Sequence, residues 1–124
     1  MRNLIILMLL FIGAQMSAQF KSVPISNWND LKSENAILVD VRTVQEFEQG
    51  HLCEAKNLDY KATDFKVKIQ ELPKDSIIYV YCKTGVRSEN AATLLTKLGY
   101  RNVVNLEGGF NAFTELGGTP CLTN

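Results

Sequence analysis

Apolar and polar residues follow one another along the chain in blocks that predict strands and helices in turn. Apolar runs at 36–42, 77–81 and 103–106 are typical of strands buried on both faces. Between the last two runs, the apolar residues of segment 88–98 recur at helical spacing and predict a helix that ends at Gly99. Strands that alternate with helices predict one α/β domain with a mostly parallel sheet.

Weaker patterns predict the remaining elements. Pro24 indicates that the extended segment 21–25 is an edge strand, and Ser26 is a suitable cap for a brief helix ending at Leu31. The other expected elements are a helix from the capping box Thr43-Val44-Gln45-Glu46 through Gln49, a short strand at 55–58, a polar helix at 62–72 and a last short helix after Gly108-Gly109.

The first eighteen residues have the layout of a secretory signal peptide. Arg2 supplies a positive start, an apolar run covers 4–14, and the small residues Ser17 and Ala18 follow. The run is shorter than the ~20 residues that span a bilayer. We therefore expect cleavage after residue 18, a domain at 19–124, a periplasmic or secreted location and no stable membrane association after cleavage. An uncleaved membrane anchor is the alternative.

Composition narrows the possible partners. The chain has 124 residues, enough for one domain with a sizeable core, and its 46% hydrophobic content is ordinary for a globular protein. Lys and Arg together balance Asp and Glu at 13 each, and no basic or acidic block is present. This balance argues against a nucleic-acid partner and is compatible with a monomer, which we expect.

The cysteine count favours a working thiol over a disulfide scaffold. Cys53, Cys82 and Cys121 are too few, and odd in number, for a disulfide-rich fold. A Cys53–Cys121 disulfide, or a role for Cys53 in resolving an oxidised Cys82, are both open alternatives. His51 is the only histidine, which argues against a histidine-based metal site and is more typical of a structural role.

The main candidate site is the segment after the strand at 77–81. Cys82 comes directly after this strand, and a loop with Gly85 and the cations Lys83 and Arg87 leads into the helix. Helix N-termini and nearby cations lower the pKa of a thiol, so the pattern predicts a thiolate nucleophile in an anion cradle. The alternative is that Cys82 is merely a small buried side chain at a strand end.

Two further features refine this hypothesis. Only four residues separate Cys82 from Arg87, a smaller loop than the phosphate-binding Cys-x5-Arg loop of protein tyrosine phosphatases, so a single sulfur atom fits better than a phosphoryl group. Asp40 and Arg42 end the strand at 36–42, at the sheet edge where α/β proteins place their sites. They are candidates to support the site, or else form a structural ion pair.

These residues carry a family resemblance. The segment Cys82-Lys83-Thr84-Gly85-Val86-Arg87-Ser88 resembles the active-site loop of single-domain rhodaneses, Cys-x-x-Gly-x-Arg-Ser. Other blocks resemble the family in the same order, from about Ile25 to Cys121: Leu38-Val39-Asp40-Val41-Arg42, Glu46-Phe47-Glu48-Gln49-Gly50-His51-Leu52, Ala55-Lys56-Asn57-Leu58 and Leu106-Glu107-Gly108-Gly109-Phe110-Asn111-Ala112-Phe113. The chain departs from the family where Glu54 replaces a glycine and Phe113 replaces a tryptophan.

The resemblance implies a rhodanese-like fold: a three-layer α/β domain in which helices flank a mostly parallel sheet of about five strands. It also implies a sulfurtransferase with no cofactor and no metal, acting on a small-molecule sulfur donor and acceptor. In this family match, Cys82 is the nucleophile, and Asp40 and Arg42 brace the site. The residues expected to hold the substrate and the persulfide are Lys83, Thr84, Gly85, Val86 and Arg87.

Two functions of other classes compete with this one. A non-catalytic rhodanese-like module would bind sulfur or a partner, but the intact cysteine and arginine argue against it. A small phosphatase or arsenate reductase is disfavoured by the short loop.

Overall fold

The computed structural model describes residues 19–122, and it contains a five-stranded, all-parallel sheet in the order β1-β5-β4-β2-β3. The strands are β1 (Lys21–Pro24), β2 (Ala36–Asp40), β3 (Lys56–Asn57), β4 (Ile77–Tyr81) and β5 (Val103–Glu107). The predicted signal peptide at 1–18 lies outside the described residues. Within 19–122, no helix is long and apolar enough to cross a bilayer.

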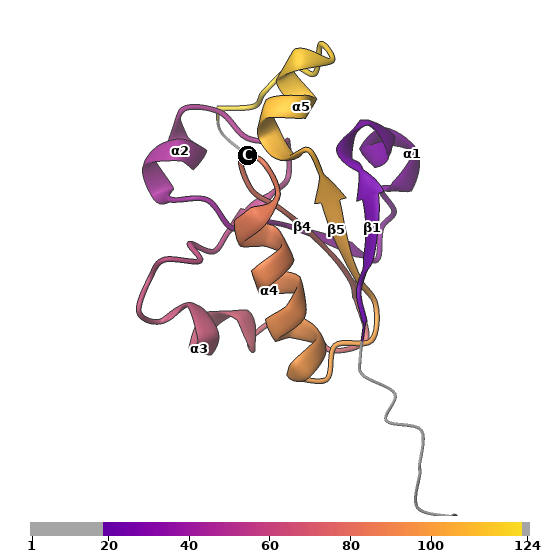
Figure 1. The fold of residues 1–124 in the computed structure, drawn as a ribbon, viewed down its shortest axis with the longest axis vertical. Coiled ribbons are helices and arrows are strands. Elements are labelled where there is room, and N and C mark those ends of the chain that lie inside the picture. The colour runs from indigo at the N-terminus through magenta and orange to yellow at the C-terminus, as the bar shows by residue number, and fades with distance from the viewer. Residues whose placement is uncertain (1–18, 123–124) are drawn as a thin grey trace, which may run out of the picture.

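Helices cover both faces of the sheet, which gives the predicted three layers (Figure 1). On one face, α3 (Phe65–Ile69) and α4 (Val86–Lys97) enclose a core with the apolar side chains of β4 and β5. On the other, the 3₁₀ turn η1 (Ile25–Asn27), α1 (Trp28–Leu31) and α5 (Gly109–Glu115) enclose a second core. The remaining helix, α2 (Val44–Glu48), follows β2.

The central strand β4 carries the candidate site into the middle of the molecule. Ile78 and Val80 face the α4 side, whereas Tyr79 and Tyr81 face the α1 side, and all four are buried. Burying side chains of this size stabilises a fold by roughly 1.5–3 kcal/mol each. The end of β4, and with it Cys82, is therefore held from both faces.

Several predicted boundaries change in the structure. The first helix begins with η1, and Ser26 does not cap it. The polar helix expected at 62–72 is α-helical only at Phe65–Ile69. On both sides of it the backbone N–H groups bond three residues back, as Phe65 does to Ala62 and Leu72 to Ile69, so the ends are turns. The helix predicted to begin at Ser88 begins at Val86 instead. The capping box between Thr43 and Glu46 is confirmed.

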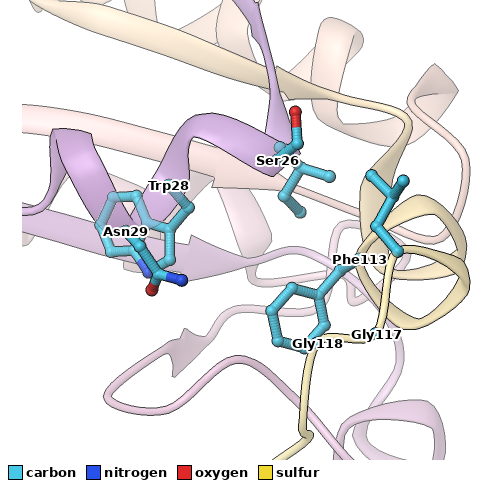
Figure 2. A pocket seen from close by; sticks show the side chains of 8 residues that line it. Ser26, Trp28, Asn29, Phe113, Gly117 and Gly118 are labelled. Carbon is cyan, nitrogen blue, oxygen red and sulfur yellow. The ribbon is translucent and has the colours of Figure 1, made fainter.

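The structure shows where the two departures from the family pattern, Glu54 and Phe113, lie. Glu54 adopts φ 69°, the left-handed region that favours glycine. Phe113 lines a cavity of about 270 Å³ between the η1–α1 segment and α5, opposite Trp28 (Figure 2). Gly118 lies directly against the Phe113 ring, where a Cβ would fall 2.5 Å from a ring carbon. This cavity contains no residue of the Cys82 loop.

Cys53 and Cys121 form a disulfide with their Cα atoms 5.2 Å apart. Beside it, the backbone N–H groups of His51 and Cys121 donate to each other's carbonyl oxygens, at 2.9 and 2.8 Å. Of the two alternatives for Cys53, the structure therefore shows the disulfide with Cys121 and not a free thiol that could resolve an oxidised Cys82. Cys82 is left as the free thiol of the protein.

Candidate active site

The loop between β4 and α4 is supported from below by the start of α5. The backbone N–H of Phe110 donates to the Cys82 carbonyl at 2.8 Å, and that of Asn111 donates to the Lys83 carbonyl at 3.1 Å. Gly109 makes this approach possible, because a Cβ there would lie 2.5 Å from the Cys82 oxygen. The loop carbonyls therefore point into α5, which leaves the loop N–H groups to face the sulfur.

The Cys82 sulfur lies within reach of hydrogen-bond donors from this loop. The Gly85 N–H donates to Sγ at 3.0 Å, and the Ser88 hydroxyl oxygen lies 3.4 Å from Sγ. Gly85 has φ 132° and is the N-cap of α4, a backbone conformation that side-chain-bearing residues rarely adopt. Cys82 itself is only 1% exposed, so a reactant must be small enough to reach the sulfur.

The donors decide the charge state of the thiol. Burial raises the pKa of Cys82, but the Ser88 hydroxyl and the backbone N–H groups of Ser88, Gly85 and Thr84 together lower it below its ordinary value. Hydrogen bonding to the charged form thus outweighs desolvation. The sulfur lies at the N-terminus of the twelve-residue helix α4, a position that favours its anionic form.

The predicted binding residues divide into two groups. The backbone of Thr84 and Gly85 faces the sulfur, whereas the side chains of Lys83, Thr84 and Val86 are exposed. Arg87 departs from the prediction. Its Nη1 and Nη2 donate to Oε1 and Oε2 of Glu46 at 2.7 and 3.0 Å, so its guanidinium is engaged by a carboxylate rather than open toward the sulfur.

Asp40 and Arg42 form a buried ion pair beneath the loop. Arg42 Nη2 lies 2.7 Å from Asp40 Oδ2 and also donates to the Gly50 carbonyl at 2.7 Å. Burial opposes the charge, but Asp40 raises the pKa of Arg42 above its ordinary value. The guanidinium stacks 4.2 Å from the centre of the Phe110 ring. Phe110 therefore contacts Arg42 through its ring and the Cys82 carbonyl through its backbone N–H.

The sequence also matches a known protein family. Residues 25–116 match the family described as the rhodanese-like domain. The chain belongs to the rhodanese-like family. Among its relatives, a sulfurtransferase of Allochromatium vinosum is 36% identical over 85 residues, which are 68% of this chain and 78% of the relative. The thiosulfate sulfurtransferase GlpE of Pseudomonas syringae is 36% identical over 93 residues, or 74% and 85% of the two chains.

Solved structures of rhodanese-like proteins have the same fold. A rhodanese-like domain protein from Staphylococcus aureus matches with a TM-score of 0.72 and 28% identity, over 85% of this chain and all of that one. A rhodanese-related protein from Thermoplasma volcanium matches with a TM-score of 0.73 and 25% identity, over 83% and 99% of the two chains. The α/β fold predicted from the resemblance is therefore confirmed, and the chain is a member of the rhodanese-like sulfurtransferase family.

Two residues of this rhodanese-like domain act at the site without having been predicted to do so. Ser88 was part of the loop motif, but its position six residues after Cys82 says nothing about where its hydroxyl points. Glu46 was predicted only as a helix cap. Its contact with Arg87 joins residues 41 positions apart, a separation that no local pattern encodes.

His51 has the structural setting that was expected of it. It is buried, its ring stacks on Phe47 with centroids 3.8 Å apart, and its Nδ1 lies 3.0 Å from the Phe47 carbonyl. Across residues 19–122, no three His, Cys, Asp or Glu side chains gather closely enough to hold a metal ion.

Proposed function

We propose that this rhodanese-like domain is a sulfurtransferase that moves a sulfane sulfur from a thiosulfate-like donor to a thiophilic acceptor through a persulfide on Cys82. The observation that carries the proposal is the Cys82 sulfur, 3.0 Å from the Gly85 N–H and 3.4 Å from the Ser88 hydroxyl. Two relatives named as sulfurtransferases, each at 36% identity, support the same reaction class.

In the first half of the reaction, the Cys82 thiolate attacks the outer sulfur of thiosulfate. A sulfur–sulfur bond forms to Cys82 as the bond to the sulfonate sulfur breaks, and sulfite leaves with the electron pair. The product is the anionic persulfide of Cys82. The donors that lower the thiol pKa also favour this anion, because N–H groups aimed at a charged sulfur need no rearrangement when it forms.

In the second half, a nucleophilic acceptor attacks the terminal sulfur of the persulfide. With cyanide the product is thiocyanate, and the electron pair of the broken sulfur–sulfur bond returns to the Cys82 thiolate. No proton and no external electron carrier enters either half. Both partners are small in this scheme, in keeping with the 1% exposure of Cys82.

We also propose that the protein acts outside the cytoplasm, as an exported monomer. The apolar run at 4–14 supports export through a signal peptide. The Cys53–Cys121 disulfide supports it independently, because such bonds persist mainly in oxidising compartments.

Steady-state thiocyanate formation from thiosulfate and cyanide tests the reaction. We expect turnover by the unmodified protein and none by Cys82→Ala, since no other free thiol is present. Cys82→Ser tests the same point with a side chain of nearly the same shape. Turnover by either variant at the rate of the unmodified protein contradicts the proposal, and no turnover by any form favours a non-catalytic module.

A further inference from the structure

Arg87 is the loop cation expected to hold an oxyanion, yet its charge is paired with a carboxylate. Both terminal nitrogens of its guanidinium donate to Glu46, one to each carboxylate oxygen, at 2.7 and 3.0 Å. This paired arrangement uses the Nη1–Nη2 edge, one of those through which arginine binds a sulfonate or phosphate, and it neutralises the guanidinium charge. The side chains are only 18% and 28% exposed, so solvent screens the pair incompletely.

Glu46 is fixed in this position by its own helix. Its Oε1 accepts hydrogen bonds from the backbone N–H of Thr43 at 3.2 Å and from the Thr43 hydroxyl at 3.0 Å. The Arg87 guanidinium, aided by Thr43, lowers the pKa of Glu46 to about 2. Glu46 is therefore an anion at any physiological pH, and the Arg87–Glu46 pair has no net charge.

The other charges of the site are balanced in the same way. Asp40 and Arg42 neutralise each other below the loop. Lys83 is exposed and forms no ion pair with any described residue, so it is the remaining loop cation opposite one thiolate. A donor of charge −2 meets twice the repulsion from the thiolate that a donor of charge −1 meets at the same distance.

We propose that Glu46 is a specificity-determining residue, which occupies Arg87 and thereby tunes the site toward sulfane-sulfur donors that carry one negative charge rather than two. This inference rests on the proposed sulfur transfer. The chemistry is the same for both classes of donor. Thiosulfate leaves as sulfite, the methanethiosulfonate anion leaves as methanesulfinate, and each delivers one sulfur atom to the Cys82 thiolate to give the same persulfide anion.

The test compares these two donors, which differ by a methyl group in place of one charged oxygen. The measured quantity is kcat/KM for thiocyanate formation with each donor at low ionic strength, expressed as the ratio of thiosulfate to methanethiosulfonate. We expect Glu46→Gln, which keeps a capping side chain at this position, to raise the ratio about fivefold. Arg87→Gln, which leaves Glu46 unpaired, should lower it.

Glu48→Gln is the matched control, because it removes the same charge from an exposed position on the same helix and should leave the ratio unchanged. An unchanged ratio in Glu46→Gln, or an equal rise in Glu48→Gln, overturns the role of Glu46. So does a shift in the same direction for Glu46→Gln and Arg87→Gln, which indicates damage to the loop rather than electrostatics. Failure of the unmodified protein with both donors contradicts the proposed function instead.

Discussion

At the scale of single residues, one of the groups that lower the pKa of Cys82 is the hydroxyl of Ser88. The Ser88 hydroxyl lies 3.4 Å from the Cys82 sulfur and 3.0 Å from the Gly85 carbonyl, to which it can donate. A hydroxyl has a single proton to give. When Cys82 is a thiol, the proton can stay on the Gly85 carbonyl; when Cys82 is a thiolate, the proton stabilises the sulfur. Ser88 thus couples the backbone of the loop to the ionisation of the nucleophile.

Replacing Ser88 by alanine should therefore make the thiol less acidic. Thiolate is the reactive form, so the alkylation rate rises with pH through the pKa of Cys82, which lies below its ordinary value. Without the hydroxyl the curve moves to higher pH, and the rate near neutral pH falls roughly tenfold, as expected for one lost hydrogen bond to a charged group.

The pH dependence of Cys82 alkylation by iodoacetamide measures this shift. Thr93→Ala is the control, because Thr93 lies on the same helix and its hydroxyl donates to the Glu89 carbonyl at 3.0 Å. A shift to lower pH in Ser88→Ala, or an equal shift in Thr93→Ala, contradicts the role of Ser88.

The sequence singled out Cys82 as the candidate site but predicted only part of its surroundings. Cys82 and Gly85 could be chosen because a strand, a glycine and a helix start are local features. Glu46, the partner of Arg87, could not be chosen in this way, because tertiary packing brings it from α2 to the loop. The cations were expected to hold the thiolate, and Arg87 does interact with it electrostatically, but the hydrogen-bond donors that lower its pKa belong to Ser88, Gly85 and Thr84.

At the scale of elements, α5 is the support on which the active-site loop rests. The first turn of α5 binds the Cys82 and Lys83 carbonyls, and Gly109 at its start has φ 60° and no Cβ, which would collide with both of them. A loop whose carbonyls are held in this way cannot turn its N–H groups away from the sulfur without losing buried hydrogen bonds.

Gly109→Ala should break this support. A Cβ there would lie 2.5 and 2.6 Å from the oxygens of Cys82 and Lys83, so the loop must shift. We expect a loss of at least about 2 kcal/mol in the free energy of unfolding, and slower sulfur loading of Cys82. Urea denaturation and donor-dependent loading measure the two effects.

Gly117→Ala is the control for backbone strain alone. Gly117 has φ 87° but nothing within 4 Å of its Cβ position, so alanine costs only about 1 kcal/mol and leaves loading unchanged. Equal effects of the two substitutions on loading would contradict the role of Gly109.

Element types were more predictable than element ends. The parallel direction of the strands and the capping box of α2 were predicted from local patterns, and both are confirmed. The helix expected at 62–72 shrinks to Phe65–Ile69, although Phe65, Ile69 and Leu72 are buried at helical spacing. The residues on either side form turns with bonds between residues three apart, which the apolar pattern does not distinguish from an α-helix.

At the scale of the whole molecule, the disulfide ties the end of the chain to its middle. Cys53 and Cys121 are 68 residues apart in sequence, and the loop they close contains Cys82 and the whole segment between β4 and α4. The sequence could not distinguish this disulfide from a role for Cys53 at Cys82. The positions of three cysteines along the chain do not show which two lie close together in the fold. Pro120 packs against Gly50, where a Cβ would fall 3.1 Å from the Pro120 side chain. This contact places the segment before Cys121 beside the segment before Cys53.

Removing the disulfide should destabilise the folded protein without touching the nucleophile. Closing a loop of this length is worth about 4 kcal/mol by the chain-entropy relation, so the Cys53→Ser, Cys121→Ser double variant should unfold at clearly lower urea concentration. Cys82→Ser is the control and should keep the midpoint of the unmodified protein. Thiol counting in denaturant without reductant should find one reactive cysteine, and three would contradict the disulfide.

The central claim is that Cys82 is held as an anion by the loop N–H groups and accepts one sulfur atom. The intact mass of the protein before and after thiosulfate or methanethiosulfonate tests it most directly. We predict a gain equal to one sulfur atom, located on the peptide that contains Cys82, absent from Cys82→Ala and reversed by cyanide. No gain with either donor, or the same gain in Cys82→Ala, would contradict the account.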